Sequence, residues 1–369
     1  MKLGIDARPV QAEKLAGIGV YTHEIISNLS DEEVHLFFRS KENTGWYTKS
    51  FINHTLKFPS YRWKFEQIWE TSALPYLSNK TKVDVFWGPR FYVPPKLKCK
   101  SVSTIHDIAY AIVPNIVNAK QADYFNRLIN YSVENANHFI TVSETTKNDF
   151  CSFFKVSPEK VHVIYNGYST FYKEKPAETY VQSVLKDKNI PEKFILFLGT
   201  LEPRKNLINL VKAYIKSEAY RDEIPLVLSG KLGWLNEELM KIVNPLIEEK
   251  KVILTGFLSN EELRVLYHSC NFFAFPSLYE GFGIPVLEAM SAGAPVLTSN
   301  NSALKEIFSD DAVLTEATSV DSIVEGINKL MNNNLRNELS QKGKVLSEKF
   351  SWEKCAEEHK ALFHKLAQS

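Results

Sequence analysis

Two successive series of short apolar runs constrain the fold of this chain more than any other feature. The runs of the first series are residues 2–6, 34–38, 83–87, 101–105, 138–142 and 161–165. Those of the second series are residues 194–198, 226–229, 252–255, 272–275, 296–299 and 313–315. Segments with apolar residues at helical spacing separate the runs, and this alternation is typical of parallel α/β architecture. We therefore predict an α/β protein in which each apolar run is a buried strand.

The length of the chain and a polar interruption predict where its domains meet. The 369 residues are too many for one ordinary core and suit two domains of similar size. Residues 171–190 are polar, with Lys, Glu and Pro and little periodicity, and we interpret them as the linker. This interpretation gives an N-terminal Rossmann-like domain at residues 1–170 and a C-terminal one at residues 191–350. A last amphipathic helix is expected within residues 351–369.

Composition excludes several classes of protein. With 44% hydrophobic and 24% charged residues and a net charge of +1, the chain resembles an ordinary soluble protein and makes no case for nucleic-acid binding. The four cysteines form no C-x-x-C pair, so neither a zinc site nor a disulfide framework follows. The N-terminus lacks the apolar stretch of a signal peptide, and no run of eighteen apolar residues occurs. We expect a cytoplasmic protein, at most resting on a membrane.

A basic segment in the first half leaves a membrane contact open. Its six cations are Lys80, Lys82, Arg90, Lys96, Lys98 and Lys100, and they are opposed within the segment by Asp84. Such a cluster suits anionic lipid headgroups on the inner face of a membrane. An ordinary solvated face is the equally simple interpretation.

A pair of glutamates around a glycine-rich loop is the strongest sign of a ligand site. Seven residues separate Glu280 from Glu288, and they include the loop 281–283. A helix is predicted over residues 284–292, and helical side chains lean toward the N-terminus, so Glu288 should point back at the loop. Because a buried carboxylate is costly without a hydrogen-bonding partner, we predict that both carboxylates face one hydroxyl-rich ligand. The alternative is that Glu288 pairs with a buried Arg while Glu280 caps the helix.

Two adjacent cations lie where the first strand of the second series meets a helix. Arg204 and Lys205 precede a helical pattern of apolar residues that begins at Leu207. Cations are normally unfavourable at a helix N-terminus, where the helix dipole already presents positive charge. Their presence predicts that the guanidinium, the ammonium and the backbone N–H groups hold a phosphate there. The alternative is a pair of solvated charges on an exposed loop.

The sequence around the glutamate pair resembles that of a known family. Residues 280–296, EGFGIPVLEAMSAGAPV, are similar to the E-x7-E signature of retaining glycosyltransferases of the GT-B fold, family 4. The resemblance covers nearly the whole chain. It implies an α/β GT-B protein with two Rossmann-like domains facing across a cleft and a C-terminal helix that crosses back to the N-terminal domain. It also implies no bound metal, and the sequence agrees, because no D-x-D pair occurs.

The resemblance assigns roles in donor binding to residues of the second half. Arg204 and Lys205 would hold the donor pyrophosphate and neutralise it as it leaves. Glu280 would hold the ring hydroxyls of the sugar, and Glu288 the ribose diol. The loops that would frame the donor contribute Gly281, Phe282, Gly283, Gly199, Thr200, Phe257 and Leu258.

The first half contributes two further segments to the predicted site. Gly17 and Gly19 open the first helix; as a dinucleotide fingerprint the segment is poor, so an NAD site is not expected. In the family this loop approaches the donor phosphates and the acceptor, and Tyr21 would contact the acceptor or lie behind the contact. His106 and Asp107 resemble the HD pair of mannosyltransferase-like members. His106 would touch the donor sugar, and Asp107 would orient it or bind the acceptor.

These resemblances together predict a reaction. Taken together, the motifs resemble those of bacterial mannosyltransferases of surface-polysaccharide assembly, which implies transfer of mannose from GDP-mannose to a saccharide or lipid-linked saccharide. The nucleotide sugar is a co-substrate, and no cofactor is expected. Glucosyl or rhamnosyl transfer from a UDP- or dTDP-sugar, a sugar-nucleotide epimerase of the same fold, and a non-catalytic nucleotide-sugar binding subunit are the alternatives.

Overall fold

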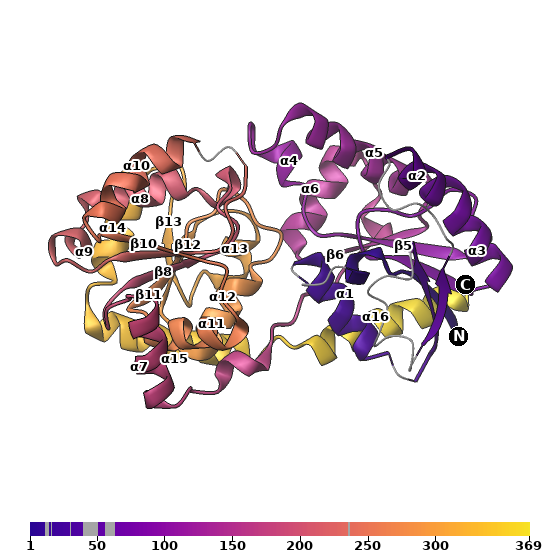
Figure 1. Cartoon of the computed structure of the whole chain (residues 1–369). Coiled ribbons are helices and arrows are strands. Elements are labelled where there is room, and N and C mark those ends of the chain that lie inside the picture. The colour runs from indigo at the N-terminus through magenta and orange to yellow at the C-terminus, as the bar shows by residue number, and fades with distance from the viewer. Residues whose placement is uncertain (12–14, 16, 30, 40–50, 56–62, 235–236) are drawn as a thin grey trace. The chain divides into compact units, whose positions relative to one another are not determined.

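The chain divides into two compact units, each built on one sheet with helices on both faces (Figure 1). The computed structural model describes residues 1–11, 15, 17–29, 31–39, 51–55, 63–234 and 237–369. Unit 1 comprises Met1–Ile108, Val117–Gly167 and Trp352–Ser369. Unit 2 comprises Ala109–Ile116 and Tyr168–Ser351.

Unit 1 contains a seven-stranded sheet with the order β3-β2-β1-β4-β5-β6-β7. Its strands are β1 (Lys2–Asp6), β2 (Glu33–Phe38), β3 (Ile52–Thr55), β4 (Val85–Gly88), β5 (Lys100–Ile105), β6 (His138–Thr141) and β7 (Val161–Val163). Every neighbouring pair is parallel, and Ile5 of β1 lies opposite Leu36 of β2 and Trp87 of β4. Because helices cover both faces, the central strands are buried along nearly their whole length, including the polar Ser101, Ser103 and Thr104 of β5.

The helices of unit 1 have clear local causes. They are η1 (Arg8–Gln11), α1 (Ile18–Ser27), α2 (Trp63–Ile68), a π-helical turn η3 (Trp69–Ala73), α3 (Leu74–Thr81), α5 (Ala119–Asn135), α6 (Glu144–Phe154), η4 (Pro158–Lys160) and α16 (Trp352–Ala367). The longest of them, α5, begins with a capping box. The Asn118 side chain accepts a hydrogen bond from the backbone N–H of Gln121, and the Gln121 side chain accepts one from the backbone N–H of Asn118. Helix α16 packs against α1 and β4, which joins the C-terminus to unit 1 (Figure 1).

Unit 2 contains a six-stranded parallel sheet with the order β10-β9-β8-β11-β12-β13. Its strands are β8 (Ile195–Leu198), β9 (Leu226–Ser229), β10 (Val252–Gly256), β11 (Phe272–Phe275), β12 (Val296–Ser299) and β13 (Val313–Thr315). Its helices are α4 (Ala109–Ile112), η5 (Thr170–Lys173), α7 (Glu178–Asp187), η6 (Pro203–Lys205), α8 (Leu207–Lys216), α9 (Glu218–Arg221), α10 (Glu237–Glu248), α11 (Asn260–Ser269), α12 (Ile284–Ala292), α13 (Ser302–Phe308), α14 (Val320–Lys329) and α15 (Asn333–Ser347). The topology places β8 and β11 side by side, so the loops that follow them emerge at the same edge of the sheet.

The predicted fold is confirmed: two parallel sheets with the last helix packed on the first unit. The strand Ile52–Thr55 was missed because it is a half-exposed edge strand without an apolar run. The predicted linker at residues 171–190 differs from the structure, which has η5 and α7 there, within unit 2. Val181, Val184 and Leu185 of α7 are buried at helical spacing, a short pattern that the polar flanks obscured.

Candidate functional site

The loop after β8 is held in place by glycine packing and by one asparagine. A side chain at Gly230 would overlap the carbonyl oxygen of Gly199, so these two strand ends approach as closely as they do because position 230 has no Cβ. Asn206 ends the loop in the left-handed conformation, with φ of 61°. Its side-chain amide donates to the carbonyl oxygens of Pro276 at 2.9 Å and Ala317 at 2.7 Å. These contacts fix the backbone between β8 and α8.

Arg204 and Lys205 converge on the carboxylate of Glu280. Nη1 of Arg204 donates to Oε2 of Glu280 at 2.6 Å, and Nζ of Lys205 donates to Oε1 at 2.6 Å. Glu202 contacts the other edge of Arg204: its Oε1 accepts from Nε at 3.1 Å and lies 3.0 Å from Nη2. The side chains of Arg204 and Lys205 are 20% and 10% exposed, so the interpretation as solvated loop charges is wrong. Two cations and two carboxylates balance each other in this cluster.

The charges of the cluster fix the protonation of Glu280. Burial raises the pKa of this carboxyl, but Arg204 and Lys205 outweigh burial and hold the pKa at about 2. Burial lowers the pKa of Lys205, as does the charge of Arg204, while Glu280 opposes both. Glu280 is therefore ionised at any working pH. It accepts hydrogen bonds and has no proton to give.

The loop from Glu280 to Gly283 presents its backbone. The backbone N–H of Glu280 donates to Oγ of Ser302 at 3.1 Å. Gly283 precedes α12 with φ of 111°, and this helix has no side-chain cap, so the alternative in which Glu280 caps it is wrong. The ring of Phe282 is buried against Phe350, with centroids 5.7 Å apart. Any ligand contact from this part of the loop therefore comes from the main chain.

Glu288 has a different neighbourhood from Glu280. Its Oε2 accepts a hydrogen bond from the hydroxyl of Tyr267 on α11 at 3.2 Å, and no Arg of the described residues forms an ion pair with it, which the alternative required. Burial raises the pKa of Glu288 to about 8, and the Tyr267 hydroxyl opposes this rise only in part. Burial raises the pKa of Tyr172, and the charge of Glu288 raises it further. Tyr172, on η5, therefore also lies near Glu288. The predicted ribose role stays a prediction.

The remaining predicted donor residues in unit 2 differ in exposure. Thr200 is exposed, and Leu258 is buried. Phe257 is 55% exposed after β10, and Nζ of Lys231 lies 5.7 Å from its ring centroid. An exposed aromatic ring with a cation over it is suited to stacking with a planar base. Leu258 contributes to the core instead of offering its side chain.

In unit 1, His106 follows β5 and is neutral. Its Nε2 donates to the carbonyl oxygen of Pro89 at 2.8 Å, which leaves Nδ1 as a hydrogen-bond acceptor. Burial lowers the His106 pKa to about 4, although the Pro89 carbonyl and Asp107 act in the other direction. The rings of Tyr21 and Phe91 pack edge-on against the imidazole, with centroids 4.7 and 5.6 Å away. These contacts fix the plane of the ring.

Tyr21 belongs to a buried chain of hydrogen bonds. It is 1% exposed, so the prediction of a direct acceptor contact is wrong and the alternative position behind the contact fits. Nε1 of Trp87 donates to Oγ1 of Thr104, which bonds the Tyr21 hydroxyl at 3.1 Å. Nδ1 of His359 donates to the carbonyl oxygen of Cys355, so its Nε2 accepts from the Tyr21 hydroxyl at 2.6 Å. The chain joins α16 to the residues that support His106.

The glycines of the first loop have separate uses. Gly17 has φ of 49°, and a Cβ there would meet nothing within 4 Å. A Cβ at Gly19 would lie 3.0 Å from the carbonyl oxygen of Pro9, so this glycine lets α1 pack on the preceding turn. Residues 12–14 and 16 of the same loop lie outside the described residues. Asp107 follows His106 as a half-buried side chain.

Three residues of these neighbourhoods were not among the predicted site residues. They are Glu202, Asn206 and Tyr267. Glu202 and Asn206 flank the cation pair in the sequence Glu-Pro-Arg-Lys-Asn, and this proximity was the available signal. Tyr267 gave none, because its contact with Glu288 depends on the packing of α11 against α12.

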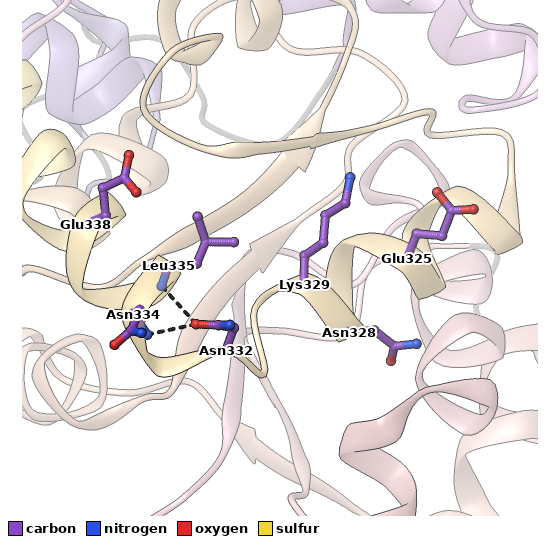
Figure 2. Close-up of a pocket in the computed structure, with 7 residues that line it drawn as sticks. All are labelled: Glu325, Asn328, Lys329, Asn332, Asn334, Leu335 and Glu338. Carbon is purple, nitrogen blue, oxygen red and sulfur yellow. Dashed lines mark hydrogen bonds between the residues drawn. The ribbon is translucent and has the colours of Figure 1, made fainter.

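A pocket of about 740 Å³ lies elsewhere on unit 2, at the turn between α14 and α15 (Figure 2). It is lined by Glu325, Asn328, Lys329, Asn332, Asn334, Leu335 and Glu338. Oδ1 of Asn332 is used in capping α15, where it accepts from the backbone N–H groups of Asn334 and Leu335. The pocket shares no residue with the Arg204 cluster, and both glutamates of its lining are exposed.

The described residues also bear on metal binding and on membrane insertion. Within the described ranges, His, Cys, Asp and Glu side chains form no group of three or more arranged to hold a metal ion. In the same part of the chain, no helix combines the length and apolar character needed to cross a membrane.

Comparison with known families matches both halves of the chain. The family described as Glycosyltransferase Family 4 matches residues 15–170, and the family described as Glycosyl transferases group 1 matches residues 182–345. The second match contains Arg204, Lys205, Glu280 and Glu288.

Individual proteins give the same result. O-antigen chain mannosyltransferase B of Escherichia coli is 30% identical over 273 residues, which cover 73% of this chain and 71% of that protein. Serotype-specific mannosyltransferase WbdA of Escherichia coli is 32% identical over 257 residues, which cover 67% of this chain and 31% of that protein. The crystal structure of HepE of Anabaena in complex with UDP and glucose is 17% identical with a TM-score of 0.76, and the match covers 99% of each chain. At this identity the structural likeness shows the fold.

Proposed function

The chain belongs to glycosyltransferase family 4 and is a GT-B glycosyltransferase, and from this premise we propose that it transfers mannose from GDP-mannose with retention at the anomeric carbon. The acceptor is a saccharide or lipid-linked saccharide of surface-polysaccharide assembly. Relatives named for O-antigen mannosyl transfer support the sugar and the process. The observation that carries the chemistry is the Glu280 carboxylate bridging Arg204 and Lys205.

The bridge supports an exchange of partners when the donor binds. The diphosphate of the donor takes the hydrogen bonds that Arg204 and Lys205 give to Glu280. The released carboxylate of Glu280 then accepts hydrogen bonds from the sugar hydroxyls, aided by the backbone of the loop after it. As the bond from C1 to the diphosphate breaks, negative charge grows on the departing oxygen, and both cations bind it more strongly than in the intact donor.

The proposed reaction balances without a metal ion or a protein nucleophile. The electron pair of the breaking C1–O bond goes to the diphosphate, and the acceptor hydroxyl forms the new C1–O bond on the same face. The acceptor proton passes to an oxygen of the departing diphosphate. The two cations supply the electrostatic stabilisation.

His106 and Glu288 have supporting roles in this proposal. His106, neutral and with Nδ1 as an acceptor, suits a hydroxyl of the donor sugar. Glu288 suits the ribose diol once its carboxyl group has ionised. The exposed ring of Phe257 offers a surface for the base.

A panel of labelled nucleotide sugars tests the proposal. The protein is incubated with GDP-mannose, UDP-glucose or dTDP-rhamnose, each with and without saccharide acceptors, and products are separated by chromatography. Hydrolysis or transfer of GDP-mannose, and of no other nucleotide sugar in the panel, supports the proposed donor. Turnover of another nucleotide sugar would identify that compound as the donor. Release of an epimerised sugar in the absence of an acceptor would show that the protein is an epimerase and not a transferase.

We also propose a weak peripheral contact with the cytoplasmic face of a membrane through unit 1. Lys82, Lys96 and Lys98 of the basic segment are exposed. Tyr76 on the neighbouring α3 is 60% exposed, with Nζ of Lys80 5.9 Å from its ring centroid. Exposed cations beside an aromatic ring suit an anionic lipid surface.

A further inference from the structure

We propose that Glu202 is a positioning residue: it holds the guanidinium of Arg204 in the direction that the departing diphosphate requires. This inference rests on the proposed function of the loop after β8. It gives a catalytic purpose to a carboxylate that forms an ion pair with a cation expected to bind the donor diphosphate.

The guanidinium of Arg204 is held along two separate directions. Its Nε and Nη2 edge faces Oε1 of Glu202, at 3.1 and 3.0 Å. Its Nη1 donates to Oε2 of Glu280 at 2.6 Å and to the carbonyl oxygen of Tyr279 at 3.1 Å. Because the five N–H donors of a guanidinium lie in one rigid plane, fixing one edge fixes where the opposite corner points. Glu202 therefore fixes the direction in which the N–H groups of Nη1 point.

Glu202 is itself fixed by the backbone around it. The N–H of the preceding Leu201 donates to the carbonyl oxygen of Lys231 at 2.8 Å, and the N–H of Lys205 donates to that of Glu202 at 3.0 Å. A Cβ at Gly233 would lie 2.9 Å from the Leu201 oxygen and 3.3 Å from Cβ of Glu202, so this glycine allows the two segments to touch. These contacts hold the main chain at Glu202, and its side chain is 7% exposed, so its ion pair pays less of the entropic cost that weakens ion pairs between mobile surface side chains.

The two carboxylates of the cluster do different work. Glu280 touches both cations and, in the proposed reaction, gives them up to the diphosphate. Glu202 contacts the edge of Arg204 that faces away from Glu280, so it stays in place during that exchange. Lys205 has another support, since its Nζ lies 4.5 Å from the ring centroid of Phe275. Glu202 also acts on Lys205, but only through its charge, which is the smallest of the effects on the Lys205 pKa. Loss of Glu202 should therefore act mainly through Arg204 and leave Lys205 in place.

Glu202→Gln keeps the size of the side chain and removes its charge, and Glu192→Gln, at an exposed position of the same unit, is the matched control. We expect Glu202→Gln to lower kcat by roughly a hundredfold, the scale of a misplacement of about 1 Å. KM for the donor should change less than about threefold, because the donor keeps its other contacts. In an Arg204→Ala background the same substitution should cost less than about twofold. The control should match the parent protein in both backgrounds.

A spectroscopic measurement tests the same geometry without any turnover. The Nε–H signal of Arg204 in a ¹⁵N spectrum, assigned by its absence in Arg204→Lys, should exchange slowly with water while Glu202 accepts from it. Glu202→Gln should speed this exchange at least tenfold, and Glu192→Gln should not. Thermal unfolding of each variant shows whether it is folded.

The outcomes separate this inference from the proposed function. A kcat of Glu202→Gln equal to that of the wild type overturns the positioning role. A loss of kcat that is equally large in the wild-type and Arg204→Ala backgrounds overturns it too. Unchanged Nε–H exchange in Glu202→Gln overturns it as well, even in a protein for which no donor has been found. Failure of the wild-type protein to turn over any sugar of the panel contradicts the proposed function and leaves the exchange measurement to decide on Glu202.

Discussion

Binding of a nucleoside diphosphate should draw a proton off Glu288. Burial raises the pKa of this carboxyl to about 8, so about nine molecules in ten carry it protonated at pH 7. A ribose diol donates hydrogen bonds, which favour the ionised carboxylate. If Glu288 binds the ribose, GDP binding at pH 7 should therefore release roughly 0.9 of a proton from this residue.

The same pKa sets the size and the pH dependence of the effect of Glu288→Gln. A hydrogen bond to an ionised carboxylate is worth about 1.5–3 kcal/mol, which corresponds to roughly a 10- to 150-fold change in Kd. Ionising a group with a pKa of about 8 costs about 1.4 kcal/mol at pH 7, or one factor of ten. The advantage of the wild-type protein over Glu288→Gln should thus be small at pH 6, rise about tenfold per pH unit, and level off above pH 8.

Calorimetric titration with GDP measures both quantities. At pH 7, the difference between the apparent binding enthalpies in phosphate and in Tris buffer is proportional to the number of protons released. The proton release of Glu288→Gln is subtracted from that of the wild type, which removes the protons that the diphosphate itself contributes. Tyr267→Phe removes the hydrogen bond that partly lowers the Glu288 pKa, so the levelling-off should move to higher pH. Equal proton release in wild type and Glu288→Gln, or a ratio of Kd values that does not vary with pH, would refute the ribose role.

Three other measurements test the proposed mechanism and the stability of the fold. Arg204→Ala and Lys205→Ala should each lower kcat by roughly a hundred- to a thousandfold with little change in KM, and the double variant should fall short of the product because both side chains serve one developing charge. Full kcat in Arg204→Ala would exclude this loop as the leaving-group clamp. Transfer should survive exhaustive chelation with EDTA, and a loss that magnesium or manganese restores would contradict the metal-independent mechanism. The folded pKa of Glu288 is raised above its unfolded value, so its stabilising effect is complete below pH 4.5 and is lost as pH rises toward 8. Chemical denaturation should show the free energy of unfolding of the wild type falling relative to Glu288→Gln over that interval, and parallel curves would show that Glu288 titrates normally.

Vesicle flotation tests the membrane contact. Anionic vesicles should retain the protein at low salt and release it at high salt, because a Debye length of about 10 Å at 0.1 M salt shrinks as salt is added. Replacing Lys96 and Lys98 by Gln should weaken retention, with replacement of Lys216 and Lys241 of unit 2 as the charge-matched control. Equal binding to neutral and anionic vesicles would make the basic segment an ordinary solvated face.

The sequence predicted the sheets well because most strands covered on both faces are short runs rich in apolar residues. All six strands of unit 2 were expected close to their observed bounds. The edge strand Ile52–Thr55 carries no such run, and the helix Glu178–Asp187 shows three apolar positions among charged ones. Both were missed because a partly exposed segment leaves a weaker apolar pattern than a strand buried on both faces.

The residues of the site were easier to identify than their partners. Arg204, Lys205 and Glu280 were found from local context, and the structure brings them together. That Glu280 bridges both cations depends on β8 and β11 being neighbours in the sheet, across 75 and 76 residues of sequence. Tyr21 was expected to contact the acceptor or to lie behind that contact, and the structure places its hydroxyl against Thr104 and His359, which fits the second alternative. Spacing identifies which residues are unusual, and packing decides what they touch.

The charge balance of the Arg204 cluster bears on product release as well as on catalysis. A pocket with two buried cations and no carboxylate would bind a free nucleoside diphosphate tightly, because its departure would leave both charges unpaired, at a cost of several kcal/mol. In the proposed cycle Glu280 returns to Arg204 and Lys205 as the diphosphate leaves, so the cations always have a partner. Glu280→Gln should therefore hold GDP more tightly than the wild type while losing transfer. Calorimetry with GDP decides this: a Kd equal to or weaker than that of the wild type would mean that Glu280 does not compete with the diphosphate for the two cations.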